Sequence, residues 1–521
     1  MEHIRTCEEI ISALDPKDAA SRELVSRAYE FAQNAHATQT RYSGAPYFVH
    51  PAEVGYRLAH MGMDAHTIAA GLLHDCLEDA GVASAILEAQ FDREVLSLVR
   101  GVTKLGALRY RGLERHTESL RRLFAATAQD IRVLIIKLTD RLHNAKTLEF
   151  VPADKRARIA HETLEIYAPI ADRLGMSVVK TALEDASFPY AYPKEFERTK
   201  ELLKERKREN ERRLEKAEKD LKRVLAEAQM REFRTEARVK GTYSTFRKLQ
   251  RKQWDITAIH DIMALRIIVP TLADCYAVLG LVHKQWRPVP GKIKDYIAFP
   301  KPNGYQSIHT TVYTGDGGAL EIQIRTEAMH RESLYGIASH LTYKEVQGRK
   351  KRGGGLDWIR QFLPGGGSAQ REVSAHVKPR ASRTVPEWVK ELASADTDTE
   401  ESEEYLENLR TDFFSHRVFV FTPKGDVIDL PLAATPIDFA YAIHTEIANK
   451  MAGARVNGKM VSLETPLHNG DMVEIITKAS AKPSRKWHDV AKTTLAKKMI
   501  RAALSARKQE DAGVRKTQKK F

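Results

Sequence analysis

The stretch HTIAAGLLHDCLEDA, residues 66–80, decides the fold of the first part of the chain. Its apolar residues recur every three or four positions, which predicts a helix over residues 66–80. On such a helix a spacing of four places His74 above Glu78 and Asp75 above Asp79. A purely structural helix rarely gathers so much charge on one side, because burying unpaired charge is costly. This stretch therefore predicts both a helical fold and a chemical site.

The same helical period continues on both sides of this stretch. Residues 24–37 and 131–148 repeat it, and polar turns such as residues 42–46 separate the segments. We therefore expect an all-α domain over residues 1–194. Within it, Asp140, Asn144 and Thr147 stand at offsets of four and seven, so they share a second polar helix face.

Two imidazoles and two carboxylates form a candidate metal site: His50, His74, Asp75 and Asp140. Nitrogen and oxygen ligands of this kind suit Mn²⁺, Fe or Zn²⁺. A metal bound there would polarise a phosphate ester and activate water. A lone His-Asp pair often arises by chance, and a histidine on a helix surface is usually solvated. The joint pattern with Glu78-Asp79 and the distant Asp140 is much more specific.

A long charged run and a change of pattern follow. Residues 195–232 are rich in Lys, Arg and Glu with spaced leucines, which predicts a long solvated helix; a nucleic-acid-binding face is the less favoured alternative. From residue 238 the pattern becomes mixed α/β. Residues 264–269, 305–313 and 320–326 indicate strands, and residues 272–286 indicate a helix.

A second chemical constellation lies in this α/β region. Asp261 precedes one strand and Glu321 lies on another, so the two carboxylates could serve as metal ligand and general base. Tyr305 and His309 offer rings for stacking on a base. Alternation with charges outward is also what an ordinary half-exposed sheet shows. Cations that would neutralise phosphates surround the carboxylates: Arg238, Lys240, Lys248, Arg266, Lys292, Lys294 and Lys301.

Composition limits the remaining possibilities. The chain has 521 residues and a formal net charge of +14, which suits polyanionic partners such as nucleotides or RNA. Its three cysteines lie far apart and form no CxxC pair, as expected in a reducing compartment. We expect no membrane partner, because no apolar run approaches the roughly 20 residues that a bilayer requires. Residues 417–476 have the pattern of a compact β-rich unit that begins with a hairpin.

Three motifs in the helical region resemble the HD hydrolase domain of RelA/SpoT homologues: RYSGAPYFVHP (41–51), LHDCLED (73–79) and KLTDRLHN (137–144). The resemblance implies a hydrolase of (p)ppGpp. It further implies that Mn²⁺ is held by His50, His74, Asp75 and Asp140, and that Glu78 and Asp79 position or activate the attacking water. Arg41 would stack on guanine. Tyr42 stands where the family usually has Lys. The other implied nucleotide contacts are Ser43, Asn144 and Thr147.

Five motifs in the α/β region resemble the (p)ppGpp synthetase domain, which is similar to nucleotidyltransferases: RVKGTYS (238–244), HDIMALR (260–266), KDYIA (294–298), KPNGYQSIHT (301–310) and LEIQIRT (320–326). The implied reaction moves pyrophosphate from ATP to the 3′-hydroxyl of GDP or GTP. Asp261 would bind Mg²⁺, and Glu321 would act as metal ligand or base. Tyr305 would stack on guanine and Arg238 on adenine. Lys240, Ser244, Lys248 and Lys294 would contact phosphates, and Asn303, His309 and Gln323 would complete the acceptor pocket.

Two positions of this region depart from the family pattern. Lys292 stands where bifunctional members usually have Arg, which keeps the charge without the planar fork. Ala264 stands where the family usually has Gly, and its methyl group adds bulk at the entry to a strand. Both departures concern the synthetase.

Residues 417–477 resemble a TGS domain, through VFVFTPKGD (418–426), PIDFAYAIHT (436–445) and NGDMVEI (469–475). In ribosome-bound relatives the histidine of the second motif contacts tRNA, which makes His444 a candidate for a tRNA or ribosome contact. Long family members continue into a helical region, a zinc-finger or RRM-like region and an ACT domain. We expect this chain to contain only the start of the helical region and to lack the distal C-terminal regulatory domains.

The sequence thus predicts a cytoplasmic, bifunctional enzyme of several domains. The expected order is a hydrolase domain (1–194), a synthetase domain with its leading helix (195–345), a linker (346–415), a small β-grasp-like TGS domain (416–478) and the start of a helical region (479–521). Two alternatives remain open at this point. One is a hydrolase with a weak or silent synthetase, and the other is a ribosome- or tRNA-binding regulator with vestigial catalysis.

Overall fold

The computed structural model describes residues 3–16, 18–103, 127–259, 262–301, 303–315, 318–339, 417–424, 427–468 and 470–505. The chain divides into two compact units. The first contains the described residues up to 339, and the second contains those from 417 onward. The predicted linker (residues 346–415) lies outside the described residues. The two units are presented separately below.

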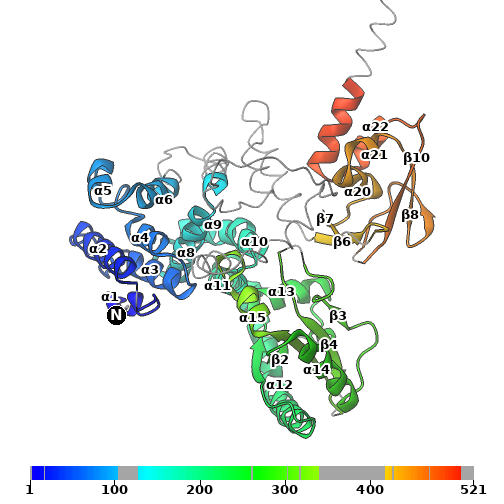
Figure 1. The fold of residues 1–521 in the computed structure, drawn as a ribbon, viewed down its shortest axis with the longest axis horizontal. Coiled ribbons are helices and arrows are strands. Elements are labelled where there is room, and N and C mark those ends of the chain that lie inside the picture. Colours follow the sequence, from blue (N-terminus) through cyan, green and yellow to red (C-terminus); the bar gives the residue numbers. More distant parts are fainter. Residues whose placement is uncertain are drawn as a thin grey trace, which may run out of the picture. The chain divides into compact units, whose positions relative to one another are not determined.

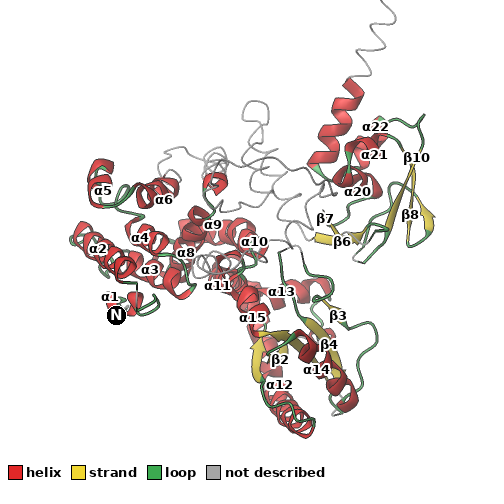
Figure 2. Cartoon of the chain, in the orientation of Figure 1, coloured by secondary structure: helices red, strands yellow, loops and turns green. Residues whose placement is uncertain are grey.

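The first half of unit 1 is helical, as predicted (Figures 1 and 2). Its helices pack around a continuous apolar core that includes Leu58, Leu72 and Leu138. The elements are α1 (Cys7–Ile11), α2 (Ala19–Ala35), α3 (Val49–His60), α4 (Ala65–Leu73), α5 (Ser84–Gln90), α6 (Arg93–Thr103), α8 (Arg132–Lys146), η1 (Leu148–Phe150), α9 (Ala153–Glu162), η2 (Thr163–Tyr167), α10 (Ala168–Arg173) and α11 (Ser177–Ala191).

Helix α4 is shorter than the sequence predicts. It begins where the Asp64 side chain accepts a hydrogen bond from the Thr67 backbone N–H, and it ends at Leu73 rather than at residue 80. At its end the His74 Nδ1 lies 2.7 Å from the Gly71 carbonyl oxygen, which is the acceptor that the next helical N–H would use. Residues 74–79 therefore follow the helix as a series of turns.

Two glycines allow α3 and α4 to approach closely. A Cβ atom on Gly71 would lie 2.3 Å from Leu58 Cδ1, and one on Gly55 would lie 2.7 Å from Leu72 Cδ2. A larger residue at either position would displace the leucine side chain that faces it. This contact matters for the site, because His50 lies on α3 and His74 lies at the end of α4.

The second half of unit 1 is an α/β fold around a five-stranded sheet with the order β1-β2-β5-β4-β3. Strands β2 and β5 are parallel, and the other neighbours are antiparallel. A 35-residue helix, α12 (Pro193–Glu227), leads into it, as predicted from the charged run. The other elements are β1 (Arg234–Val239), α13 (Thr242–Arg251), η3 (Ile256–Ala258), β2 (Met263–Val269), α14 (Leu272–Gln285), β3 (Lys294–Asp295), β4 (Ile308–Tyr313), β5 (Ala319–Thr326) and α15 (Glu327–Tyr335).

The sheet has one apolar face and one polar face, because side chains alternate along each strand. Leu265, Ile322 and Ile324 belong to a buried cluster that also contains residues of α12 and α14. Paired residues on the other face are polar: Glu321 stands beside Thr311 of β4, and Gln323 stands between Arg266 of β2 and His309 of β4. The predicted alternation over residues 320–326 is thus confirmed. Strand β4 begins at Ile308, three residues later than predicted.

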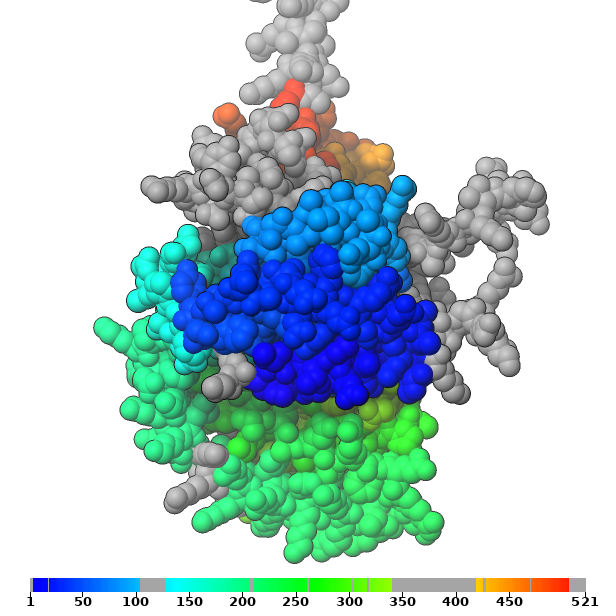
Figure 3. Space-filling view, turned by 90° about the vertical axis from the view of Figure 1, so that its left-hand side faces the viewer, coloured from blue at the N-terminus to red at the C-terminus, as the bar shows by residue number. Residues whose placement is uncertain are grey.

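The two halves of unit 1 meet where the α10–α11 turn contacts the end of α15 (Figure 3 shows the halves against each other). The Ile337 N–H donates a hydrogen bond of 2.9 Å to the Leu174 carbonyl, and the Ser177 hydroxyl donates to the Ser333 carbonyl. Gly336 has φ +53°, and a Cβ there would lie 2.0 Å from the Leu174 carbonyl oxygen. Only glycine permits this approach without displacement of the backbone.

Unit 2 is a small α/β module. Strands β6 (Arg417–Phe421) and β7 (Val427–Pro431) form the predicted antiparallel hairpin, whose turn residues 425 and 426 lie outside the described residues. A second sheet has the order β10-β8-β9. The other elements are α20 (Pro436–Ile443), α21 (Thr445–Asn449), β8 (Met451–Val456), β9 (Lys459–Val461), β10 (Val473–Thr477), α22 (Arg485–Val490) and a helix over residues 494–505.

A buried carboxylate fastens the residues after β10 to this module. Asp438 is fully buried on α20. Its Oδ1 accepts hydrogen bonds from the backbone N–H groups of Lys492 and Thr493, each 2.8 Å long, and its Oδ2 accepts from Thr435. Ala491, Ala496 and Ile500 pack in the same apolar cluster as Tyr441. The segment beyond β10 is therefore part of the core of unit 2.

Among the described helices of the whole chain, none combines the length and the apolar character that crossing a membrane requires.

Candidate functional site

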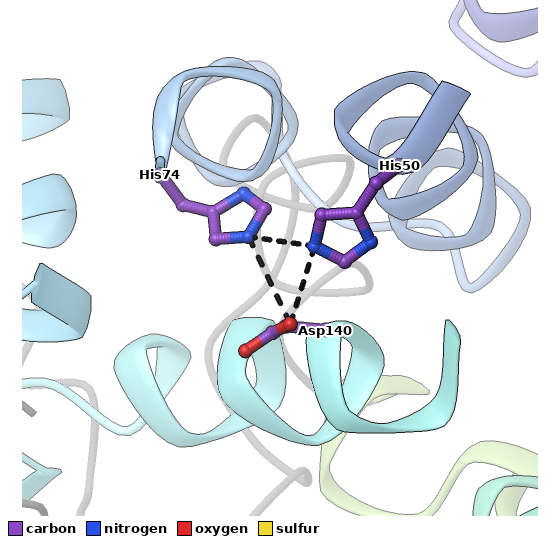
Figure 4. Close-up of side chains that lie close together, drawn as sticks. All are labelled: His50, His74 and Asp140. Atoms are coloured by element: carbon purple, nitrogen blue, oxygen red, sulfur yellow. Dashed lines mark hydrogen bonds and ion pairs between the residues drawn. The ribbon is translucent and has the colours of Figure 1, made fainter. Parts of the chain in front are cut away.

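Three of the predicted metal ligands converge in the first half of unit 1 (Figure 4). One donor atom from each of His50, His74 and Asp140 lies within 4.8 Å of the others, and all three residues are buried. The Nε2 atoms of the two histidines are 3.2 Å apart, and Asp140 Oδ1 lies 3.2 Å from His50 Nε2 and 3.9 Å from His74 Nε2. The residues come from α3, the end of α4 and α8, respectively.

The fourth predicted ligand, Asp75, borders this group. Its Oδ1 lies 3.2 Å from His74 Nε2, and its Oδ2 lies 3.5 Å from His50 Nε2. The structure therefore brings together all four residues that the sequence singled out as metal ligands, although they come from positions far apart in the chain.

In both histidines the other ring nitrogen, Nδ1, also has a contact, and this contact orients the Nε2 atom. Because a carbonyl only accepts, His74 Nδ1 must carry the proton that it donates to Gly71, and this leaves a lone pair on Nε2. The other ring nitrogen of His50, Nδ1, lies 2.8 Å from Nδ1 of the buried His143. Metal-binding histidines in proteins are typically fixed in this way through their second nitrogen. Two imidazole nitrogens and carboxylate oxygens at this separation fit a divalent cation.

The electrostatics of the group agree with this fit. Burial opposes the charged form of Asp140, but attraction to the Lys137 ammonium, 2.7 Å away, holds the pKa of Asp140 well below its usual range. Burial lowers the pKa of His50 and lowers that of His143 to about 2, so both rings are neutral near pH 7. An ionised carboxylate beside neutral imidazoles is the state that binds a metal.

The turn after α4 places two more carboxylates next to the group. The Tyr47 hydroxyl lies 2.9 Å from Asp75 Oδ2 and 2.5 Å from Asp79 Oδ2. Glu78 is exposed beside them; partial desolvation, then the charge of Asp79, raises its pKa. A carboxylate with a raised pKa is better suited to accept a proton near neutral pH. Because residues 74–79 form turns instead of the predicted helix, these groups lie around the metal ligands rather than along one helix face.

Predicted nucleotide contacts lie at the mouth of this site. Arg41 Nη2 donates hydrogen bonds to Asn144 Oδ1 (3.0 Å) and Thr147 Oγ1 (3.3 Å), and Asn144 Nδ2 donates to Asp140 Oδ1. Ser43 lies in the same turn as Arg41, and its hydroxyl accepts a long hydrogen bond from the Ala45 N–H. Arg41, Asn144 and Thr147 therefore form one cluster that reaches the metal-binding carboxylate.

A second polar site occupies the polar face of the α/β half. His309 Nδ1 lies 2.7 Å from Glu321 Oε1, and the Tyr305 hydroxyl lies 2.7 Å from His309 Nε2. Gln323 Nε2 donates a 3.0 Å hydrogen bond to the same Glu321 oxygen. Four predicted site residues thus form one chain of contacts. Asp261, the predicted second carboxylate, lies outside the described residues.

Cations lie close to this second site, as the sequence predicts for Arg266 and Lys301. Arg325 is buried, and burial lowers its pKa to about 10; its guanidinium lies 5.5 Å from the Tyr305 ring and donates to Gln323. Lys301 lies between the rings of Tyr296 and Tyr305, at 4.8 and 5.0 Å. The buried Nε atoms of Arg266 and Arg325 have no hydrogen-bond partner among the described residues.

Some predicted synthetase residues contact the helical half instead. The Ser244 hydroxyl donates a 3.1 Å hydrogen bond to Glu184 of α11, and Asn303 Nδ2 donates one of 2.9 Å to the Asp172 carbonyl of α10. Arg238 and Lys294 are exposed, and Lys240 and Lys248 are half-buried, all in the α/β half. In unit 2, His444 is exposed, and its Nδ1 accepts a hydrogen bond from the Glu446 N–H at the start of α21.

Two residues that support the metal-ligand group, His143 and Tyr47, are not indicated by the sequence patterns. Arg325 contacts Gln323 of the second site; strand alternation predicts it on the same face as Glu321 and Gln323 but gives it no role. Lys137 shows a usable signal, because its position three residues before Asp140 on a helix permits an ion pair.

Comparison with known proteins gives three matched regions. Residues 28–177 match the HD domain, residues 237–348 match the region found in RelA / SpoT proteins, and residues 418–477 match the TGS domain. Together they cover more than half of the chain. The first contains all four candidate metal ligands, and the second contains the chain of contacts from Tyr305 to Glu321.

Curated relatives are similar over nearly the whole chain. A GTP pyrophosphokinase of Streptomyces coelicolor is 42% identical over 508 residues, which is 96% of this chain and 58% of that protein. A guanosine-3′,5′-bis(diphosphate) 3′-pyrophosphohydrolase of Aquifex aeolicus is 42% identical over 94% of this chain and 65% of its own length. A bifunctional (p)ppGpp synthase/hydrolase RelA of Mycobacterium tuberculosis is 41% identical over 96% and 66%, respectively.

The chain thus spans 58–66% of the length of these three relatives. The HD match and the buried histidine–aspartate group together indicate a divalent metal site. The order of the three matched regions, with identity of about 42% along almost all of the chain, assigns it to one family. This chain is a member of the RelA/SpoT family, with an HD domain, the region found in RelA / SpoT proteins and a TGS domain.

Proposed function

We propose that this chain is a bifunctional enzyme that both hydrolyses and synthesises (p)ppGpp, the signal nucleotide of the stringent response. Hydrolysis would yield GDP or GTP and pyrophosphate, and synthesis would transfer pyrophosphate from ATP to the 3′-hydroxyl of GDP or GTP. The observation that carries the proposal is the buried group of His50, His74 and Asp140, bordered by Asp75 and Asp79. Relatives that are named for each activity, and for both, support it.

In the proposed hydrolase site, His50, His74, Asp75 and Asp140 would hold Mn²⁺. The bound ion would polarise the phosphate ester and lower the pKa of a water molecule. Glu78 and Asp79 orient that water and accept its proton as the bond between the 3′-oxygen and phosphorus breaks. Arg41 stacks on the guanine, while Ser43, Asn144 and Thr147 contact the nucleotide. The hydrogen bonds that join Arg41 to Asn144, and Asn144 to Asp140, support this arrangement.

In the proposed synthetase site, Asp261 would bind Mg²⁺, and Glu321 would serve as metal ligand or as the base for the 3′-hydroxyl. Tyr305 stacks on guanine and Arg238 on adenine. The 2.7 Å contacts from Tyr305 to His309 and from His309 to Glu321 support a common acceptor pocket. The bond between the α- and β-phosphates of ATP breaks and AMP leaves. Phosphate contacts come from Lys240, Ser244, Lys248 and Lys294, and Asn303, His309 and Gln323 complete the pocket.

The remaining parts of the proposal concern organisation and partners. We assign the hydrolase to residues 1–194, the synthetase to 195–345, a linker to 346–415, the TGS domain to 416–478 and the start of a helical region to 479–521. His444, which is exposed at the start of α21, is the candidate for a tRNA or ribosome contact. The nucleotide substrates and the three free cysteines support a cytoplasmic location.

A paired assay of the purified chain tests the proposal. One reaction contains ATP, GDP and Mg²⁺, and the other contains ppGpp and Mn²⁺; anion-exchange chromatography measures the nucleotides in both. We expect ppGpp and AMP in the first, and GDP and pyrophosphate in the second. Hydrolysis without synthesis would replace the proposal by a hydrolase with a silent synthetase. Turnover in neither reaction would favour a binding regulator with vestigial catalysis.

A further inference from the structure

A tyrosine hydroxyl connects the metal-ligand group to the carboxylate that lies beyond it. The Tyr47 hydroxyl oxygen lies 2.5 Å from Asp79 Oδ2 and 2.9 Å from Asp75 Oδ2. A hydroxyl has a single proton to donate, so it favours one of these carboxylates at a time. When Asp75 is engaged by a cation, Asp79 is the carboxylate that needs this donor.

The ring that carries this hydroxyl is fixed on several sides. It stacks on the His36 ring, with centroids 4.7 Å apart and planes inclined by 19°. The Tyr47 backbone N–H donates a 2.9 Å hydrogen bond to the Gln39 carbonyl, and the Arg41 guanidinium lies 5.9 Å from the ring. The hydroxyl is therefore placed by a packed ring rather than by a mobile side chain.

The same neighbours also hold the backbone of the Asp79 turn. Gln39 Nε2 donates a 2.6 Å hydrogen bond to the Asp79 carbonyl, and Gln39 Oε1 accepts one of 2.6 Å from His36 Nδ1. His36 is buried, and its Nε2 lies 3.9 Å from the Cys76 Sγ within that turn. Gln39 thus bonds the Asp79 backbone, and Tyr47 bonds the Asp79 carboxylate. His36 contacts both Gln39 and Tyr47, whereas Asp79 itself is exposed.

We propose that Tyr47 is a positioning residue of the hydrolase site: its hydroxyl holds the Asp79 carboxylate toward the water, and His36 and Gln39 hold Tyr47 and the Asp79 backbone in place. The inference rests on the proposed hydrolase function. Charge-assisted hydrogen bonds to a carboxylate are about twice as strong as neutral ones. Loss of the hydroxyl therefore leaves Asp79 free to rotate toward solvent, which lowers the rate of the chemical step and leaves nucleotide binding unchanged.

The test compares Tyr47→Phe with Tyr29→Phe in the full chain. Tyr29 is the matched control, because its hydroxyl also donates a 2.9 Å hydrogen bond, but to the Arg5 carbonyl and not to a carboxylate of the site. With ppGpp and Mn²⁺ we expect Tyr47→Phe to lower kcat roughly 10- to 100-fold with KM within about twofold of wild type. Tyr29→Phe should leave both constants unchanged. An unchanged kcat in Tyr47→Phe, or full recovery with excess Mn²⁺, would overturn the inference.

A double-mutant cycle shows whether Tyr47 acts through Asp79. In an Asp79→Ala background, Tyr47→Phe should have no further effect on kcat, because no side-chain acceptor for the hydroxyl remains at position 79. Equal fold losses in both backgrounds would refute the assignment.

Hydrogen exchange supplies a readout that does not depend on turnover. Tyr47→Phe should speed amide exchange over residues 77–80 without a change at α2, whereas Tyr29→Phe should not alter residues 77–80. If the wild-type chain does not hydrolyse ppGpp, the proposed function fails, and exchange over residues 77–80 still decides whether Tyr47 orders the turn.

Discussion

Replacement of Gly336 by alanine tests the joint between the two halves of unit 1. Gly336 ends α15 with φ +53° and ψ −127°, a conformation that residues with a side chain rarely adopt. A Cβ atom there would lie 2.0 Å from the Leu174 carbonyl oxygen and 2.5 Å from the Gly175 carbonyl carbon. Both are backbone atoms, so no rotation of a side chain can relieve the overlap.

The size of the effect follows from two separate losses. Holding a residue other than glycine in such a backbone conformation costs about 1–3 kcal/mol. Moving the two segments apart also breaks the hydrogen bond from the Ile337 N–H to the Leu174 carbonyl, which contributes about 0.5–1.5 kcal/mol. The free energy of unfolding of unit 1 should therefore fall by roughly 2–4 kcal/mol, and the Tm by about 3–6 °C, because the unfolding entropy of a unit of roughly 300 residues is large.

Gly280 offers the matched control. It lies in α14, has no heavy atom within 4 Å of the Cβ that alanine would add, and has no unusual φ. Gly280→Ala should leave the free energy of unfolding unchanged or raise it by about 0.4–1 kcal/mol. Thermal unfolding followed by circular dichroism measures both variants. If Gly336→Ala melts within about 2 °C of Gly280→Ala, the close approach of the two halves is refuted.

Three further predictions concern the sites and the titrating groups. Glu321→Gln should lower synthesis of ppGpp by at least about 100-fold and leave hydrolysis intact, whereas Asp75→Asn should lower hydrolysis and leave synthesis intact. The paired nucleotide assay measures both activities. Parallel loss of both activities in either variant would contradict separate sites. Burial raises the pKa of Cys76 to about 12 and that of Cys275 to about 11, so at pH 8 a disulfide reagent should modify only the half-exposed Cys7 in the native chain and all three thiols after unfolding. Burial also raises the pKa of Glu184 above its unfolded value, so its ionisation costs stability at neutral pH. Glu184→Gln should be the more stable protein in urea at pH 8, and its advantage should shrink as the pH is lowered and wild-type Glu184 takes up its proton. A difference that stays constant as the pH is lowered would contradict this origin.

The helical and strand periods predicted much of the fold, because each period is a local property of the sequence. Residues 320–326 alternate in the sequence and form β5 with one apolar and one polar face. The prediction of a helix over residues 66–80 was too long, because the side chain of His74 takes the Gly71 carbonyl that the helix would need. Propensity and spacing do not detect a side chain that competes with the backbone.

The candidate metal site could be predicted because its ligand types are unusual on apolar helices. The residues that support this site could not be predicted, because they lie far along the chain from the residues that they contact: His143 contacts His50, and Tyr47 contacts Asp79. The contact between the two halves of unit 1 could not be predicted from the sequence either. No local pattern around Gly175 or Gly336 indicates that these two residues lie side by side. Pairwise contacts of this kind depend on the completed fold.

The hydrogen bonds of Asp438 determine where a stable fragment of unit 2 should end if it is transplanted into another protein. The matched TGS region ends at residue 477, yet the carboxylate on α20 takes two of its hydrogen bonds from residues 492 and 493. A fragment cut at residue 477 would leave a buried carboxylate without these donors, which costs about 1–3 kcal/mol or more for a charged group, and would expose the surface covered by Ala491 and Ile500. A fragment designed for transplantation or crystallisation that ends at the family boundary would therefore be less stable. A fragment that extends through residue 505 keeps the hydrogen bonds to Asp438 and the apolar packing of Ala491 and Ile500.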